Sequence, residues 1–210
     1  VFGSGIMQET AGGIANLDNR NGLVLWFTGL SGAGKTTTAR RVAELLKEAG
    51  RSAELLDGDE LRSTVCSGLG FSKEDRMENI RRIAYIAGLL ARHGVIVLVS
   101  AITPYREMRD YARNKLPGFV EIYVKCPLEV CEKRDVKGLY ARARRNEIER
   151  FTGISDPYEE PDHPDITVRT DTCSLEENSQ KIVAWIERVY PAAGLAAGCS
   201  AHFSDRRERS

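Results

Sequence analysis

Apolar and polar residues follow one another along the chain in patterns that predict strands and helices in turn. Five short apolar runs have the length of strands, and residues 95–99 are apolar throughout, as in a strand buried on both faces of a parallel sheet. Between these runs, apolar residues recur at the spacing of one helical face, for example at Ala39, Val42 and Leu46. We expect strands at 23–28, 53–56, 95–99, 119–125 and 166–169, and helices at 35–49, 73–93, 105–116, 127–133 and 175–189.

Strands and helices therefore alternate, which is typical of a parallel sheet with helices on both faces, because parallel strands need crossover connections. We predict an α/β fold, a three-layer sandwich around a mostly parallel central sheet. A further helical stretch begins near Glu60 and breaks at Gly68 and Gly70. Ser72 is placed to cap the helix 73–93, and Asp75 suits its positive end.

The chain divides into one domain with two extensions. Residues 1–20 and 191–210 are rich in small and polar residues without periodicity, so we expect flexible segments on either side of a domain at 21–190. Within the domain, residues 134–165 hold six basic residues and three prolines but little apolar periodicity. So long an irregular stretch is typical of a functional lid, and a disordered or solvated loop is the alternative.

Composition narrows the classes of partner. Thirty basic and thirty acidic residues balance, which gives no electrostatic reason to expect nucleic acid or a membrane surface as a partner. We find neither a membrane-spanning apolar run nor the layout of a signal peptide. The chain lacks a C-x-x-C pair and a metal-ligand spacing with histidine, so we expect free thiols and a cytoplasmic protein. The cysteines are Cys66, Cys126, Cys131, Cys173 and Cys199.

Residues 29–36 read G-x-x-x-x-G-K-T between a predicted strand and a predicted helix. In this context the backbone N–H groups form a cradle for phosphate oxygens at a helix N-terminus. Lys35 adds a charge for the β- and γ-phosphates, and the Thr36 hydroxyl suits a magnesium ion. A glycine-rich turn without a ligand is the alternative. The expected nucleotide-binding residues are Gly29, Leu30, Ser31, Gly32, Ala33, Gly34, Lys35, Thr36 and Thr37.

The residues near this loop favour one kind of nucleotide-dependent protein. The strand 95–99 ends in Ser100 and not in an acidic residue, unlike most motor ATPases, and the guanine-reading segment N-K-x-D is absent from the sequence. Asp57 and Asp59 instead follow the predicted strand 53–56. We expect them at the carboxyl edge of the sheet, beside the glycine-rich loop 29–36. This pattern predicts a phosphotransferase acting on a small molecule, although a polar turn also explains the two aspartates.

Six stretches follow one another along the chain: 29–37 (GLSGAGKTT), 56–62 (LDGDELR), 69–82 (LGFSKEDRMENIRR), 100–106 (SAITPYR), 134–140 (RDVKGLY) and 151–158 (FTGISDPY). In this order they make the chain resemble the adenylylsulfate kinase (APS kinase) family. The resemblance spans roughly residues 22–190 and implies a P-loop nucleoside-kinase-like sandwich with a helical or irregular lid. It implies transfer of the γ-phosphate of ATP to the ribose 3′-hydroxyl of adenosine 5′-phosphosulfate (APS), giving 3′-phosphoadenosine 5′-phosphosulfate and ADP.

The resemblance also implies roles for single residues. Lys35 and Arg134 would bind ATP, and Thr36 and Asp57 would bind Mg²⁺, with Asp57 alternatively accepting the proton of the 3′-hydroxyl. Asp59 would act in catalysis and bind APS, whose adenine Phe71 and Phe151 would sandwich. The other implied APS contacts are Arg62, Arg76, Asn79, the backbone of Ile102 and Thr103, Lys137, Gly153 and Ile154. A homodimer and a functional link to an ATP sulfurylase are further implications.

Three positions depart from the family pattern. Thr103 stands where many members have serine, and we interpret it as a backbone contact rather than a phosphorylation site. Ala141 replaces a common lid lysine, and whether Arg142 takes over its function stays open. Glu149 replaces a common basic residue.

Two alternatives to an APS kinase stay open. One is a kinase for gluconate, shikimate or a nucleotide, and the other is a nucleotide-binding module without turnover.

Overall fold

The computed structural model describes residues 22–191, and the structural account concerns that part of the chain. At its centre is a sheet of five strands in the order β2-β3-β1-β4-β5, in which every pairing is parallel. The strands are β1 (Val24–Thr28), β2 (Ala53–Asp57), β3 (Ile96–Ser100), β4 (Phe119–Lys125) and β5 (Ile166–Arg169).

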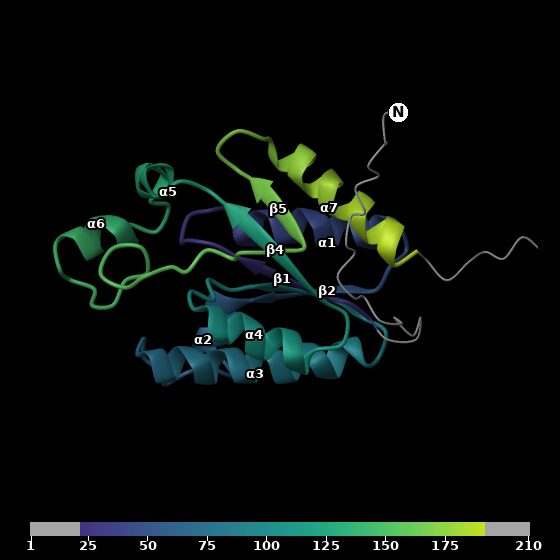
Figure 1. Cartoon of the computed structure of the whole chain (residues 1–210), viewed down its shortest axis with the longest axis horizontal. Helices are drawn as coiled ribbons and strands as arrows, with labels where there is room; N and C mark the ends of the chain where they lie inside the picture. The colour runs from purple at the N-terminus through teal and green to yellow at the C-terminus, as the bar shows by residue number, and fades with distance from the viewer. Residues whose placement is uncertain (1–21, 192–210) are drawn as a thin grey trace, which may run out of the picture.

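Helices cover both faces of this sheet, as Figure 1 shows. α1 (Lys35–Glu48) and α7 (Leu175–Val189) lie on one face, and α3 (Lys73–Ala91) and α4 (Arg106–Lys115) lie on the other. The short helix α2 (Gly58–Ser63) lies near α3, and α5 (Leu128–Arg134) and α6 (Leu139–Arg144) project beyond the end of the sheet. The predicted three-layer α/β sandwich is therefore confirmed.

The predicted elements differ from the observed ones mainly at their ends. The strand expected at 95–99 is β3, one residue later, and the helical stretch expected from Glu60 begins at Gly58. Ser72 caps α3 as predicted, since its Oγ accepts the N–H of Asp75 at 3.1 Å. Within the expected lid the chain forms α6, a helix of six residues that is too short to produce a periodic pattern.

The core consists of two layers that meet at β1. Leu25 and Phe27 belong to the cluster under α1 and α7, and Val24 and Trp26 belong to the cluster under α3 and α4. Successive strand residues point to opposite faces, so a strand that is buried on both faces must be apolar throughout.

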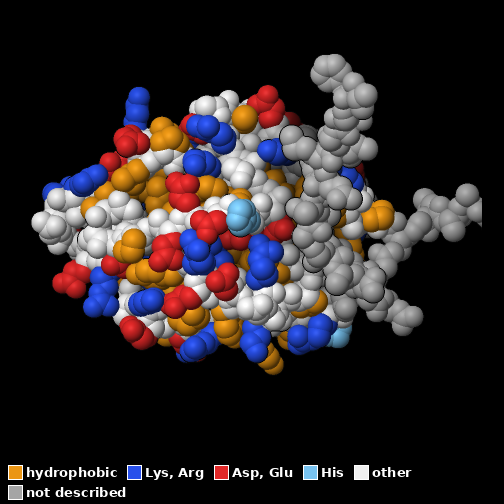
Figure 2. Space-filling view, viewed as in Figure 1, with side chains coloured by type: hydrophobic (Ala, Val, Ile, Leu, Met, Phe, Trp, Pro, Cys, Tyr) orange, Lys and Arg blue, Asp and Glu red, His pale blue; other side chains and the backbone are white. Residues whose placement is uncertain are grey.

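Three further expectations concern the chain as a whole. Cys66, Cys126, Cys131 and Cys173 are free thiols as predicted, and Cys199 lies outside the described residues. The segments expected to be flexible, 1–20 and 191–210, lie outside them too, apart from residue 191. Among residues 22–191 the helices are all too short or too polar to cross a bilayer. Basic and acidic side chains are interspersed over the face in Figure 2.

The layer between α1 and α7 provides a test of the core. Leu46 on α1 is 1% exposed, while its neighbour Leu45 is only partly buried against the same cluster. We expect Leu46→Ala to lower the free energy of unfolding by about 2–5 kcal/mol in urea titrations, because it leaves a cavity in the core. Leu45→Ala, the matched control, should cost clearly less, and equal losses would contradict this description of the core.

Candidate active site

A cavity of about 1150 Å³ opens at the carboxyl edge of the sheet. Its wall brings together the glycine-rich loop, the start of α3, the loop after β3, the segment 134–152 and residues after β5. Sixteen of the residues predicted from the sequence line this one cavity. They are Ser31, Gly32, Gly34, Lys35, Thr36, Thr37, Asp59, Arg62, Phe71, Arg76, Asn79, Ile102, Thr103, Arg134, Lys137 and Phe151.

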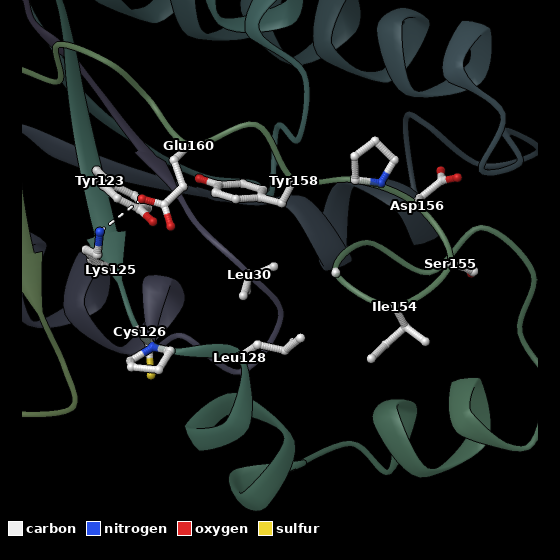
Figure 3. Close-up of a pocket in the computed structure, with 13 residues that line it drawn as sticks. Leu30, Tyr123, Lys125, Cys126, Leu128, Ile154, Ser155, Asp156, Tyr158 and Glu160 are labelled. Carbon is white, nitrogen blue, oxygen red and sulfur yellow. Dashed lines mark hydrogen bonds and ion pairs between the residues drawn. The ribbon is translucent and has the colours of Figure 1, made fainter.

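The remaining predicted residues do not line this cavity. Gly29, Ala33 and Asp57 are in this group, and Asp57 Oδ1 accepts the N–H of Asp59 at 2.8 Å. Gly153 and Ile154 line a second cavity of about 630 Å³ together with Leu30 (Figure 3). A Cβ atom on Gly153 would lie 3.0 Å from Leu30 Cδ2, so the lid segment packs closely on the glycine-rich loop at this point.

The glycine-rich loop has the geometry that its sequence predicts. Gly29, Gly32 and Gly34 have φ angles of 148°, 72° and 92°, which side-chain-bearing residues rarely adopt. A Cβ on Gly29 would lie 2.5 Å from the carbonyl oxygen of Val124, so glycine is also required there by the neighbouring strand. The loop leads into the N-terminus of α1 at Lys35, where backbone N–H groups favour an anion.

Lys35 is buried in this loop, with 9% of its surface exposed. Its Nζ donates to the carbonyl oxygen of Leu30 at 2.7 Å. Burial lowers the pKa of Lys35 to about 8, and the charge of Asp59 offsets only part of that effect. The ammonium group therefore lacks a full counter-charge, which the phosphates of a nucleotide would provide.

Oxygen donors suited to magnesium lie at the end of β2 and the start of α1. Thr36 Oγ1 is 2.8 Å from Ser100 Oγ, and Asp57 pairs with Ser100 in the register of β2 and β3. Among residues 22–191, groups of three or more His, Cys, Asp or Glu residues that could hold a metal are absent. The residues present fit Mg²⁺, which commonly takes few protein ligands and completes its shell with water and phosphate oxygens.

Arg76 connects α3 to the far side of the lid segment. Its guanidinium donates to the carbonyl oxygen of Phe71 at 3.0 Å, to Thr152 Oγ1 at 3.0 Å and to the carbonyl oxygen of Arg150 at 2.5 Å. It also lies 3.7 Å from Asp156. Sequence reasoning missed the contacts with Arg150 and Thr152 because they join positions more than seventy residues apart. Arg76 therefore has a structural part in addition to its predicted contact with APS.

Asn79 lies one helical turn after Arg76 on the same face of α3. Within the described residues its side-chain oxygen is buried and has no hydrogen-bond partner. An unpaired buried acceptor costs free energy, and a ligand with an N–H or O–H donor in this cavity would remove that cost.

The two predicted clamp residues line the same cavity in different surroundings. Phe71 is 52% exposed, and the guanidinium carbons of Arg62 and Arg76 lie 4.6 and 5.6 Å from its ring centroid. Phe151 is 9% exposed and packs edge to face on Tyr140 with centroids 5.0 Å apart. The clamp stays a prediction, because Phe151 is here part of the packing under the lid.

Contacts across the cavity hold the lid segment to the rest of the site. Lys137 forms an ion pair with Asp59, which links the segment to α2. Tyr140 donates to the carbonyl oxygen of Ser31 at 2.9 Å, and Arg134 donates to Thr170 Oγ1 at 3.0 Å. Arg142 also lines the cavity and lies 3.5 Å from Glu147.

Thr103 is 2% exposed, and its hydroxyl is engaged on both sides. Its Oγ1 accepts the N–H of Trp26 at 2.9 Å and donates to the carbonyl oxygen of Ala101 at 3.3 Å. This environment disfavours phosphorylation of Thr103, because a phosphate on this buried oxygen would replace the proton that it donates to Ala101. Trp26 therefore donates a hydrogen bond to the site in addition to packing in the core, which its place in an apolar run did not indicate.

The all-parallel sheet and the loop with its buried lysine define a P-loop kinase. A family model described as adenylylsulphate kinase matches residues 21–169, so the chain belongs to this family. The predicted family is therefore confirmed.

Relatives and solved structures agree with this assignment. An adenylyl-sulfate kinase of Chloroflexus aurantiacus is 60% identical over 170 residues, which cover 81% of this chain and 91% of the relative. An APS kinase of Mycobacterium tuberculosis, solved in complex with AMPPNP and APS, is 46% identical with a TM-score of 0.77, covering 80% of this chain and 98% of that one. A gluconokinase of Sinorhizobium meliloti, 17% identical with a TM-score of 0.55 over 81% of this chain and 94% of that one, shows a shared fold alone.

The lowered pKa of Lys35 generates a prediction about proton uptake. Free Lys35 is mostly neutral at pH 9 because its pKa is about 8, whereas bound phosphates favour the charged form and raise that pKa. We expect ATP binding at pH 9 to take up close to one proton, and much less at pH 7, by calorimetry in buffers of different ionisation enthalpy. Lys35→Arg, which stays charged, is the control; uptake at pH 9 that survives in this variant would assign the proton elsewhere.

Proposed function

We propose that this chain transfers the γ-phosphate of ATP to the ribose 3′-hydroxyl of APS. The observation that carries the proposal is a single cavity that joins a P-loop with the α3 face of Arg76 and Asn79. Membership of the adenylylsulphate kinase family supports it, as does the complex of the mycobacterial relative with AMPPNP and APS.

On the donor side, the residues bind and orient phosphate oxygens. Lys35 and the N–H groups of the loop contact the phosphates, and Arg134 contacts the nucleotide from the lid. Thr36 and Asp57 would hold Mg²⁺, which when bound neutralises charge on the β- and γ-oxygens. Asp57, or Asp59 beside it, accepts the proton of the attacking hydroxyl or orients water. In phosphoryl transfer, positioning and charge supply most of the rate.

On the acceptor side, cationic and aromatic side chains match a dianionic nucleotide. Arg62 and Arg76 offer planar guanidinium donors for its oxyanions, and the unpaired oxygen of Asn79 suits an amino group. Phe71 and Phe151 stack on the adenine when residues 134–165 close as a lid, and Lys137 then exchanges Asp59 for the substrate. Ile102 and Thr103 contact the acceptor through their backbone, and Gly153 and Ile154 support the closed lid from the second cavity.

The setting of the reaction follows from the same resemblance. We infer a cytoplasmic homodimer that receives APS from an ATP sulfurylase. The balanced charge of the chain and the absence of a membrane-spanning helix from residues 22–191 are consistent with this setting. Gluconate or shikimate as acceptor is the second candidate, which the aromatic pair Phe71 and Phe151 disfavours, because sugar acids offer no base to stack.

A panel of acceptors tests the proposed function. We expect ADP release from ATP in the presence of APS, and little with AMP, gluconate or shikimate. Lys35→Ala should lower kcat with APS by about 10²–10³, because it removes a preorganised stabiliser of the transferred group. The melting temperature of the variant shows whether it is folded. ADP release with AMP or a sugar acid, and none with APS, would overturn the proposal.

The aromatic clamp gives a second test on the acceptor side. A base stacked on an aromatic ring is worth about 1–3 kcal/mol by alanine substitution, so Phe151→Ala should raise the Kd for APS roughly tenfold or more. Its affinity for ATP alone should stay close to that of the wild type. If Phe151 serves only as core beside Tyr140, the variant will instead melt at a lower temperature and lose both ligands together.

A further inference from the structure

We propose that the hydroxyl of Tyr158 is a positioning group for the acceptor. In this proposal Tyr158 acts through Thr28 on residues 101–104, here called the acceptor loop, and so sets the affinity for APS. The inference rests on the proposed function, because it takes APS as the acceptor that contacts this loop.

Tyr158 belongs to the segment 150–160, here called the strap, which lies between α6 and β5 in the chain. Its ring lies on the wall of the second cavity, stacked on Tyr123 with centroids 6.2 Å apart (Figure 3). Its hydroxyl is 2.9 Å from Thr28 Oγ1, at the last residue of β1. Thr28 Oγ1 in turn lies 2.6 Å from the carbonyl oxygen of Ile102 in the acceptor loop.

The direction of these hydrogen bonds follows from counting protons. The carbonyl oxygen of Ile102 can only accept, so the single proton of the Thr28 hydroxyl is donated to it. Thr28 Oγ1 must then accept from the Tyr158 hydroxyl. Burial raises the pKa of Tyr158, which keeps that proton in place at neutral pH. Since Thr28 is fully buried, removal of the Tyr158 hydroxyl leaves its oxygen without a donor.

The acceptor loop needs such support because its backbone is strained. Thr103 has a φ of 49°, a left-handed conformation that is an outlier for a β-branched residue. Such conformations persist only where the surroundings hold them. Arg109 Nη1 donates to the carbonyl oxygen of Thr103 at 3.0 Å, and the N–H of Trp26 donates to the Thr103 hydroxyl.

The strap is attached to the acceptor loop and to the start of α4 at further points. The N–H of Glu159 donates to the carbonyl oxygen of Pro104 at 2.8 Å, and Glu159 Oε2 accepts the N–H of Arg106 at 2.6 Å. Tyr105 donates to Asp156 at 3.3 Å. The contact of Tyr158 differs from these because it passes through the fully buried hydroxyl of Thr28. That hydroxyl lies 2.6 Å from the carbonyl oxygen of Ile102 and 3.5 Å from that of Thr103, the two loop residues expected beside APS.

The test compares two tyrosines of the same cavity. Tyr158→Phe removes the hydroxyl that reaches Thr28, and Tyr123→Phe removes one that lies beside Glu160, while both variants keep the stacked rings. We expect Tyr158→Phe to raise the Kd and KM for APS about tenfold, equivalent to ~1.4 kcal/mol. The Kd for ATP alone, and kcat at saturating APS, should change less than about twofold. Tyr123→Phe should leave all four values unchanged.

A double variant tests the route through Thr28. Thr28→Val removes the same link from its other end, so we expect it to match Tyr158→Phe, and the pair together to be no worse than either alone. Equal APS affinity in Tyr158→Phe and the wild type, or equal effects of the two tyrosine variants, would overturn the inference alone. Weaker binding of both ATP and APS by Tyr158→Phe, together with a lower melting temperature, would also overturn the inference, because it would show that Tyr158 only supports the fold. Failure of the wild type to bind APS would instead overturn the proposed function, and this inference with it.

Discussion

β1 lies in the middle of a parallel sheet, and this position determines where the P-loop and its neighbours lie. Because all strands run the same way, their carboxyl ends meet at one edge, and the P-loop starts directly after β1. β3 and β4 flank β1, so the acceptor loop lies on one side of the P-loop and the backbone of Val124 lies against Gly29 on the other. Burial of both faces of β1 fixes this arrangement, since a shift by one residue would exchange the two core layers.

The cationic side chains of the site are paired with protein oxygens in this structure. Lys35 donates to the carbonyl oxygen of Leu30, Arg76 to that of Phe71, and Arg134 to that of Thr170. Ligand oxygens can replace these carbonyl oxygens, so that each cationic side chain keeps a hydrogen-bond acceptor. Charged ligand oxygens are stronger acceptors than neutral carbonyl oxygens. Several of the same side chains also hold the lid segment, so ligand binding and lid position share their contacts. The site is therefore built from residues with two functions.

Much of the fold and of the site could be predicted from the sequence, for reasons that are local. Apolar runs and helical periodicity located β4, β5 and α7 to the residue, and fixed spacing identified the P-loop around Lys35. The order of the strands, the contacts of Arg76 with the strap and the link from Tyr158 to Thr28 could not be predicted, because they join positions more than seventy residues apart. The six-residue helix α6 escaped because it is shorter than two helical turns. The family pattern named sixteen residues that line the cavity but not those that support it.

The proposed reaction transfers the γ-phosphate of ATP to the ribose 3′-hydroxyl of APS. The most direct measurement is the position of the new phosphate in the product, by ¹H–³¹P correlation NMR of a reaction with ATP and APS. We expect a phosphorus that couples to the 3′ proton of the ribose, with the 5′-phosphosulfate intact. A new phosphate at the 2′ position, or at the 5′ end with loss of sulfate, would contradict it.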